Sequence, residues 1–297
     1  MGCGRAMPMM SRSVLPVLTV CAALVVLWYL GAVWMNWQLV ADAQARAGAT
    51  PDLTEMIRLT LAQPRPLLPA PHQIIGELWR TTVTLPVTSR RSLVHHAWVT
   101  LSAALTGFGM GVGFGVVLAV AIVHLRALER SVMPWIVASQ AVPVLALAPI
   151  VIVALGTLGL EGLLPKAIIA AYLCFFPVTI GMVKGFRAPD AMALDLMRTW
   201  SASRAQVFWK LRLPASLPYL FAGLKVAMAA AVVGAIVAEL PAGAQAGLGA
   251  RLLAGSYFGQ TLQIWSALAM AALVSATLVG FLGIAERAVA RRMGVQA

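Results

Sequence analysis

Six apolar runs, each long enough to cross a bilayer as a helix, constrain the fold of this chain more than any other feature. The first covers residues 14–35 without a charged side chain, and a helix of that length measures roughly 33 Å, enough for the hydrocarbon core of a membrane. The others cover residues 98–123, 132–155, 165–182, 219–240 and 262–284. With 61% hydrophobic and 11% charged residues, the chain is predicted to be an all-α polytopic membrane protein with six transmembrane helices.

Charge and cysteine content exclude several other classes of protein. The net charge of +12 would suit a nucleic-acid-binding protein, but the charges lie between apolar runs and do not form one face. Cys3, Cys21 and Cys174 have no metal-binding spacing, and the last two lie inside apolar runs. His95 and His96 are adjacent, so they point to different sides of a helix. No metal and no cofactor bound by this chain is expected.

The distribution of lysine and arginine predicts the orientation, because cytoplasmic segments of membrane proteins are enriched in these residues. With both termini inside, the inner segments hold Arg5, Arg12, Arg126, Arg130, six basic residues within 184–212, and Arg287, Arg291 and Arg292. The two short outer loops hold only Lys166 and Arg251. The long outer loop carries six arginines, but long loops are translocated with less regard to charge. The expected arrangement is therefore six spans with both termini in the cytoplasm.

This orientation gives a layout of the whole chain. A cleavable signal peptide is the competing interpretation of the first run, with Ala41, Asp42 and Ala43 as its cleavage site, but the run is too long for one. The proline-rich outer loop is expected to contain an amphipathic helix at 73–80. The predicted segments are a cytoplasmic N-terminus (1–13), a first helix (14–35), a periplasmic loop (36–97), a core of five helices (98–284) with a cytoplasmic coupling loop (184–218), and a cytoplasmic tail (285–297).

The second run contains five alternating glycines. A nucleotide-binding loop is excluded, because no Lys-Ser/Thr pair follows them. In a membrane helix, Gly107, Gly111 and Gly115 would form one small face, and Gly109 with Gly113 another. Such faces predict close packing against neighbouring helices.

Polar groups inside the runs are few, and these are the candidates for a solute pathway. Gln140, Pro143 and Pro149 interrupt the third run, and prolines there free backbone carbonyls that a neighbour or a water-filled cavity must satisfy. Lys225 lies near the start of the fifth run and Glu239 at its end. Gln140 could equally form a hydrogen bond between helices, and Glu239 could anchor the following loop. The Gly-rich segment 241–261 is expected to be an outer loop or a re-entrant turn.

The segment 184–224 is a long basic, charge-bearing segment between two apolar runs. Pro189 is predicted at the first position of a helix. Ser203 and Gln206 have the spacing of a capping box, so two short helices should meet near 200–203. Pro214 and Pro218 are expected to end the second helix and begin the next span. Because such an amphipathic pair must bury its apolar side, it is predicted to bind a cytoplasmic partner protein.

This segment resembles the "EAA" loop of type I ATP-binding-cassette (ABC) importer permeases. The residues that align with this loop are Asp195, Leu196 and Met197, then Ser201, Ala202 and Ser203, and then Phe208, Leu213 and Pro214. The chain departs from the family pattern, since Asp195 replaces Glu, Leu196 and Met197 replace two alanines, and Ser201 replaces Gly. Further similarity to the nitrate, sulfonate, taurine and thiamine-precursor branch lies in 67–79, 139–156 and 213–227, and in Glu239 followed by Gly247, Leu248 and Gly249.

The resemblance implies a homodimeric, non-enzymatic transport subunit that spans the bacterial inner membrane several times. Two cytoplasmic ABC ATPase subunits would bind ATP and Mg²⁺ and contact the coupling loop, and a periplasmic or lipid-anchored binding protein would deliver a small polar solute. The solute would be a sulfonate- or nitrate-like anion, or a pyrimidine-like thiamine precursor. Leu196, Trp200 and Phe208 are expected to form the face that binds the ATPase.

Two other classes of protein are weighed against this one. A stand-alone secondary transporter would need ionisable groups near mid-membrane, whereas acidic residues are nearly absent from the runs, and among them only Glu239 lies near a span end. An integral-membrane enzyme would need a cluster of His, Asp or Glu at one depth, and the sequence contains none.

Overall fold

A computed structural model describes residues 9–241 and 244–293, and these residues contain helices and no strands. Cys3, Arg5 and most of the predicted cytoplasmic N-terminus lie outside the described residues. The described helices are α1 (Met9–Arg46), α2 (Leu53–Leu61), α3 (Pro71–Trp79), η1 (Arg80–Thr84), α4 (Leu93–His124), α5 (Arg126–Ser139), α6 (Val144–Thr157), α7 (Leu163–Phe186), α8 (Ala191–Thr199), α9 (Arg204–Val207), η2 (Phe208–Arg212), α10 (Leu213–Ala238), α11 (Leu248–Tyr257) and α12 (Thr261–Arg292).

Among the described residues, five helices are long and apolar enough to cross a membrane, and a sixth span is obtained if α5 and α6 are counted as one. The predicted all-α polytopic fold is therefore confirmed. The third span is not one continuous helix, because α5 and α6 meet at 100°. Pro143 lies directly before α6, with its ψ of 112° in the extended region, and a proline there has no N–H with which to continue α5.

The chain divides into two compact units. The first comprises residues up to Leu85 together with Ala254–Ala269, and the second comprises Pro86–Leu253 and the chain from Met270. In the first unit, Asn36 of α1 donates to the Leu68 carbonyl at 2.8 Å and accepts from the Leu67 N–H at 2.7 Å. The segment predicted as a loop from residue 36 thus begins inside α1, and it contains the expected amphipathic helix as α3.

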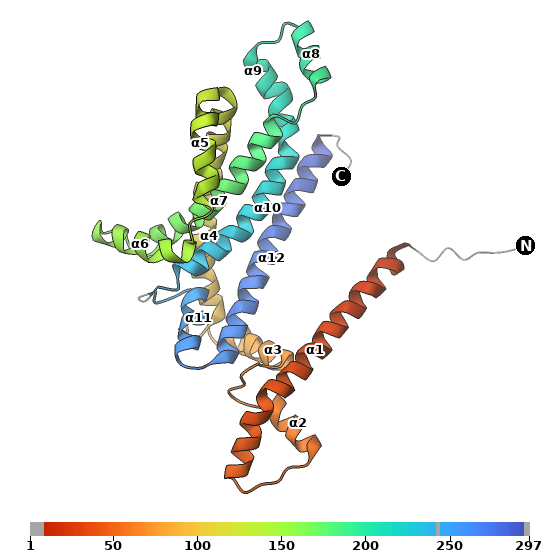
Figure 1. The fold of residues 1–297 in the computed structure, drawn as a ribbon, viewed down its shortest axis with the longest axis vertical. Helices are drawn as coiled ribbons and strands as arrows, with labels where there is room; N and C mark the ends of the chain where they lie inside the picture. The colour runs from red at the N-terminus through yellow and green to blue at the C-terminus, as the bar shows by residue number, and fades with distance from the viewer. Residues whose placement is uncertain (1–8, 242–243, 294–297) are drawn as a thin grey trace, which may run out of the picture. The chain divides into compact units, whose positions relative to one another are not determined.

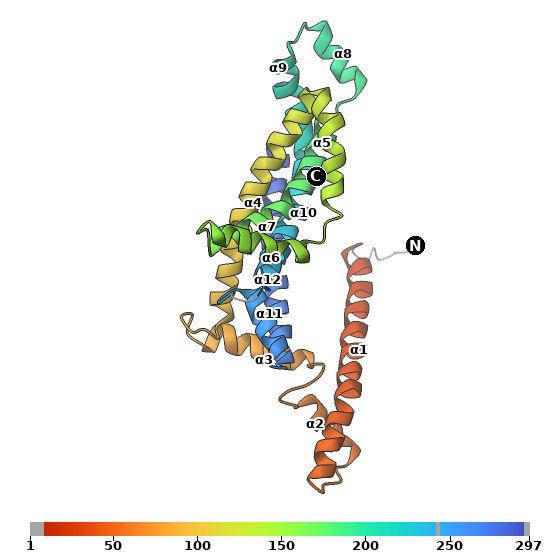
Figure 2. The same ribbon diagram turned by 60° about the vertical axis from the view of Figure 1, so that its left-hand side comes forward.

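The core of the second unit is built from α4, α7 and α10, with α7 between the other two (Figures 1 and 2). Gly107, Gly111 and Gly115 all face α7, and a Cβ added at Gly111 would lie 2.5 Å from the Cβ of Cys174. The predicted close packing on this face is confirmed. A Cβ added at Gly109 or Gly113 would meet no atom of another described segment within 4 Å, so the second small face is unused within this subunit.

Candidate functional site

The helix pair α8 and α9 lies between the spans α7 and α10, as the sequence predicts. Asp190 caps α8, because its side chain accepts a 2.8 Å hydrogen bond from the Ala193 N–H. Pro189 therefore lies before the cap and not at the first helical position. Ser203 and Gln206 form the predicted capping box of α9, so each helix start is fixed by its own residues.

The turn between α8 and α9 ends α8 with a left-handed residue. Ser201 has a φ of +49°. Its N–H donates to the Arg198 carbonyl at 2.9 Å, and the Ala202 N–H donates to the Met197 carbonyl at 3.0 Å. These two bonds define a Schellman motif, whose left-handed position normally favours glycine. Ser201, which replaces the glycine of the resembled motif, therefore has a backbone conformation that glycine adopts without steric strain.

Substitution Ser201→Gly is expected to stabilise this turn by about 1 kcal/mol, because a Cβ in left-handed backbone costs about that much. Ser201→Val should destabilise it, since a branched Cβ is the worst case. Slower amide hydrogen exchange at Ala202 in the Gly variant, and faster exchange in the Val variant, checks the prediction. Equal exchange in both variants would contradict it.

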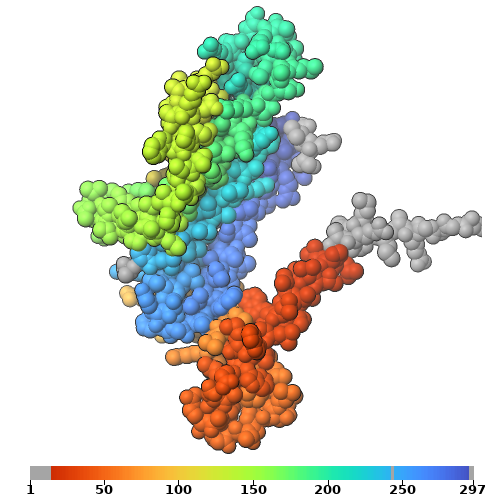
Figure 3. Space-filling view, viewed as in Figure 1, coloured from red at the N-terminus to blue at the C-terminus, as the bar shows by residue number. Residues whose placement is uncertain are grey.

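One face of α8 is apolar and exposed. Met192, Leu196 and Trp200 are spaced four residues apart on this face, and Trp200 is 72% exposed. Figure 3 shows the α8–α9 pair at the end of the second unit, uncovered on the side in view.

Phe208 does not belong to this exposed face, contrary to expectation. It is 9% exposed, and its ring lies 5.2 Å from that of Phe186 and 5.0 Å from that of His124. The next residue, Trp209, is 65% exposed instead. The candidate docking surface is therefore redefined as Met192, Leu196 and Trp200.

Pro214 and Pro218 do not interrupt the chain between α9 and α10, also contrary to expectation. The helix continues from Arg204 to Ala238 through the π-helical turn η2, in which the Leu213 N–H donates to the Phe208 carbonyl. Leu213 and Pro214 lie in the first turn of α10, directly after this π-helical turn. Asp195 pairs with Arg198 at 2.8 Å on the exposed surface of α8, and such a pair contributes little stability.

The break between α5 and α6 contains the first two pathway candidates. Gln140 follows the last residue of α5, and Pro143 precedes α6. Tyr172 of α7 donates its hydroxyl hydrogen to the Ser139 carbonyl, which holds the end of α5 against α7. The sequence pointed to Gln140 but gave no sign of Tyr172.

The two charged pathway candidates both have partners. Lys225 of α10 pairs with Glu286 of α12. Glu239 is fully buried at the end of α10 and is bonded by Thr100 and Gly249. Neither charge is therefore presented alone to a solute.

An ion pair joins the start of α5 to the end of α7, next to the segment that leads into α8. Arg187, at the end of α7, lies 2.8 Å from the carboxylate of Glu129 in the first turn of α5. Because the two residues are far apart in sequence, spacing gave no signal for this contact.

Comparison with known proteins decides the class. Residues 111–295 match the model of the binding-protein-dependent transport system inner membrane component. The chain belongs to this family.

Individual proteins similar to this chain narrow the class further. The riboflavin transport system permease protein RibX of Chloroflexus aurantiacus is 34% identical over 76% of this chain and 80% of its own. The formylaminopyrimidine transport permease protein ThiX of Halalkalibacterium halodurans is 33% identical over 62% and 68%. The putative aliphatic sulfonates transport permease protein SsuC of Bacillus subtilis is 27% identical over 70% and 75%. The chain is thus a multi-pass membrane permease of the type I ABC importer class, in the sulfonate and thiamine-precursor branch.

Proposed function

We propose that this permease acts as a homodimer with both termini in the cytoplasm, driven by a pair of ABC ATPase subunits that bind ATP and Mg²⁺. A periplasmic or lipid-anchored binding protein delivers the solute. The family supports the ATPase and the binding protein, since its members are binding-protein-dependent transport components. The distribution of lysine and arginine supports the orientation.

The main support for an ATPase contact at α8 is the exposed apolar face of this helix. Trp200 and Leu196 project from a short helix that follows the basic end of α7. Large exposed apolar side chains grouped on one face indicate a protein contact. In the proposed orientation this face lies in the cytoplasm, where lipid cannot cover it and an ATPase can.

The broken span supports a second copy of the chain. Non-helical backbone at membrane depth is tolerated only where protein buries it or water surrounds it. Ala141, Val142 and Pro143 are exposed in the single subunit. A second subunit that faces this break across an aqueous path would supply both the protein cover and the water. Gln140 and Pro143 would then line the path.

For the solute, we favour a neutral, hydrogen-bonding heterocycle over a sulfonate- or nitrate-like anion. Gln140 is polar but uncharged, and Lys225 is neutralised by Glu286. The two relatives above 30% identity are named for riboflavin and formylaminopyrimidine. Sulfonate transport, the activity named for a relative at 27% identity, remains the second candidate.

The proposed function is tested in liposomes that contain the permease, its partner ATPase and its binding protein. Uptake of riboflavin, a formylaminopyrimidine and an aliphatic sulfonate is measured with ATP on the ATPase side. We expect ATP-dependent uptake of one heterocycle, and none with an ATPase that cannot hydrolyse ATP. Uptake by the permease alone would contradict the proposal of an external motor.

A further inference from the structure

Three consecutive backbone N–H groups at the start of α11 are bound by side chains from two other helices. The Gly247 N–H donates to His96 Nδ1 at 3.0 Å, and the Leu248 N–H donates to Thr100 Oγ1 at 2.8 Å. The Gly249 N–H donates to Glu239 Oε2 at 2.9 Å. A helix start normally satisfies such donors with a residue of its own chain segment or with water, so this cap is supplied from a distance.

The three capping side chains are themselves fixed. The Thr100 hydroxyl donates to the Glu239 carboxylate, 2.9 Å from Oε2. Since His96 Nδ1 accepts, Nε2 is the nitrogen that donates, to the Arg90 carbonyl at 2.9 Å. His96 and Thr100 are one helical turn apart on α4, and all three side chains are buried. A buried network in which every member is satisfied is rigid.

Two glycines make this approach possible. Gly247 has a φ of +125°, and a Cβ there would lie 2.1 Å from the Glu239 carboxyl carbon. A Cβ at Gly249 would lie 2.3 Å from the Ile236 carbonyl oxygen. The backbone therefore touches the carboxylate where any other residue would collide with it.

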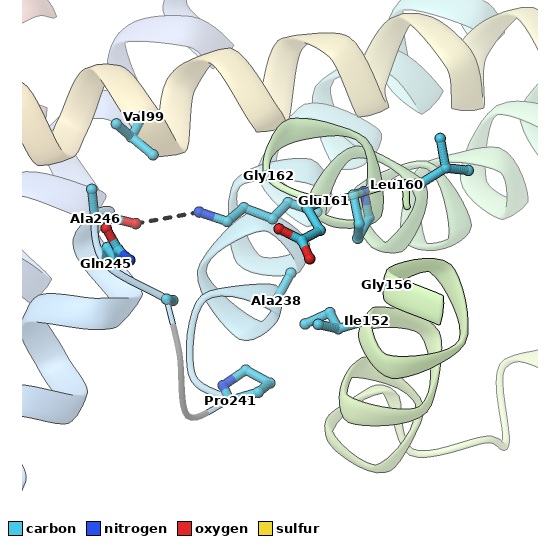
Figure 4. Close-up of a pocket in the computed structure, with 13 residues that line it drawn as sticks. Val99, Ile152, Gly156, Leu160, Glu161, Gly162, Ala238, Pro241, Gln245 and Ala246 are labelled. Atoms are coloured by element: carbon cyan, nitrogen blue, oxygen red, sulfur yellow. Dashed lines mark hydrogen bonds between the residues drawn. The ribbon is translucent and has the colours of Figure 1, made fainter. Parts of the chain in front are cut away.

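The network also holds one wall of a cavity of about 540 Å³ between α4, α6, α7 and α10. Lys166 of α7 lies 3.7 Å from Glu239 and donates to the Ala246 carbonyl at 3.2 Å, the bond drawn in Figure 4. Ala246 lines the cavity and directly precedes the capped segment. Glu161 and Gln245 add polar side chains to the lining (Figure 4).

We propose that His96, Thr100 and Glu239 are positioning residues that fix residues 246–249 as a wall of this cavity, and that the cavity receives the solute on its way into the permease. The inference rests on the proposed orientation, which places the cavity on the outer side. Loosening this wall should raise the concentration of solute-loaded binding protein needed to stimulate the complex. The ATPase, which binds at the far end of the spans, should keep its maximal rate of hydrolysis.

The test compares Thr100→Val, which keeps the shape of the side chain but removes the hydroxyl, with Thr100→Ser, which restores it. Thr106→Val is the matched control, because Thr106 lies on the same helix, is exposed, and bonds only the Ser102 carbonyl of its own helix. In the assembled complex, the solute-loaded binding protein is titrated and ATP hydrolysis is measured. Thr100→Val is expected to raise the half-stimulating concentration at least tenfold with little change in maximal rate, and Thr100→Ser and Thr106→Val are expected to match the native protein.

A second readout needs no solute. Gln245→Cys, in a background without the native cysteines, is labelled with a membrane-impermeant maleimide applied to either side of sealed vesicles. Thr100→Val should raise the labelling rate several-fold, and Thr106→Val should not. If Thr100→Val does not assemble, Glu239→Gln provides the same comparison.

The outcomes separate the two proposals. Labelling only from the cytoplasmic side, or no stimulation of the native complex by the binding protein, would overturn the proposed function, and the ratio of labelling rates would still decide the role of the network. Equal labelling and equal half-stimulating concentrations in native protein and Thr100→Val would overturn the inference.

Discussion

Substitution Trp200→Asp is expected to abolish coupled transport. Trp200 is 72% exposed at the end of α8, so the free subunit loses little when the ring is removed. If the ring fills a pocket of the ATPase, its loss and the introduction of a charge should cost at least about 2 kcal/mol of binding free energy, or roughly 30-fold in affinity. Solute-stimulated ATP hydrolysis and co-purification of the ATPase should both be lost.

A control on the same helix distinguishes docking from folding. Arg198 lies on the opposite side of α8 from Leu196 and Trp200 by helical spacing, and its pair with Asp195 is exposed. Arg198→Ala should therefore leave hydrolysis within about twofold, as expected for an exposed ion pair. Undiminished transport by the Trp200→Asp variant would show that α8 is not part of the ATPase interface.

Residues that act through local chemistry were predictable from the sequence. The capping box of Ser203 and Gln206, the junction of α8 and α9, and the glycine face of α4 each depend on neighbours within a few residues or on one helical period. For the same reason the apolar runs predicted the spans, because burial in a bilayer depends on length and polarity alone.

Residues whose surroundings are set by tertiary contacts were not predictable. Phe208 has a spacing compatible with an exposed face, but η2 changes the helical period there and directs the ring toward Phe186. Glu239 accepts a hydrogen bond from Thr100, which lies 139 residues earlier in the sequence. The 100° break between α5 and α6 likewise depends on α7, since Tyr172 binds the carbonyl at which α5 ends.

Substitution Gly111→Val is expected to prevent folding of the subunit. The added Cβ would lie 2.5 Å from the Cys174 Cβ and 2.8 Å from the Ala171 carbonyl oxygen. The second contact is with backbone, so relief requires α4 and α7 to separate along the face that also includes Gly107 and Gly115. Overpacking a side-chain contact alone costs about 1–3 kcal/mol, and separating two helices forfeits their dispersion contacts in addition.

The same helix provides a matched control two residues away. Gly113 has nothing within 4 Å of its added Cβ, so Gly113→Val changes propensity and volume in the same way without meeting α7. The yield of monodisperse protein in mild detergent should fall at least tenfold for Gly111→Val and stay near native for Gly113→Val. Equal yields would show that α4 and α7 do not approach closely. A loss confined to Gly113→Val would place the tight contact on the other face of α4, where a second subunit could lie.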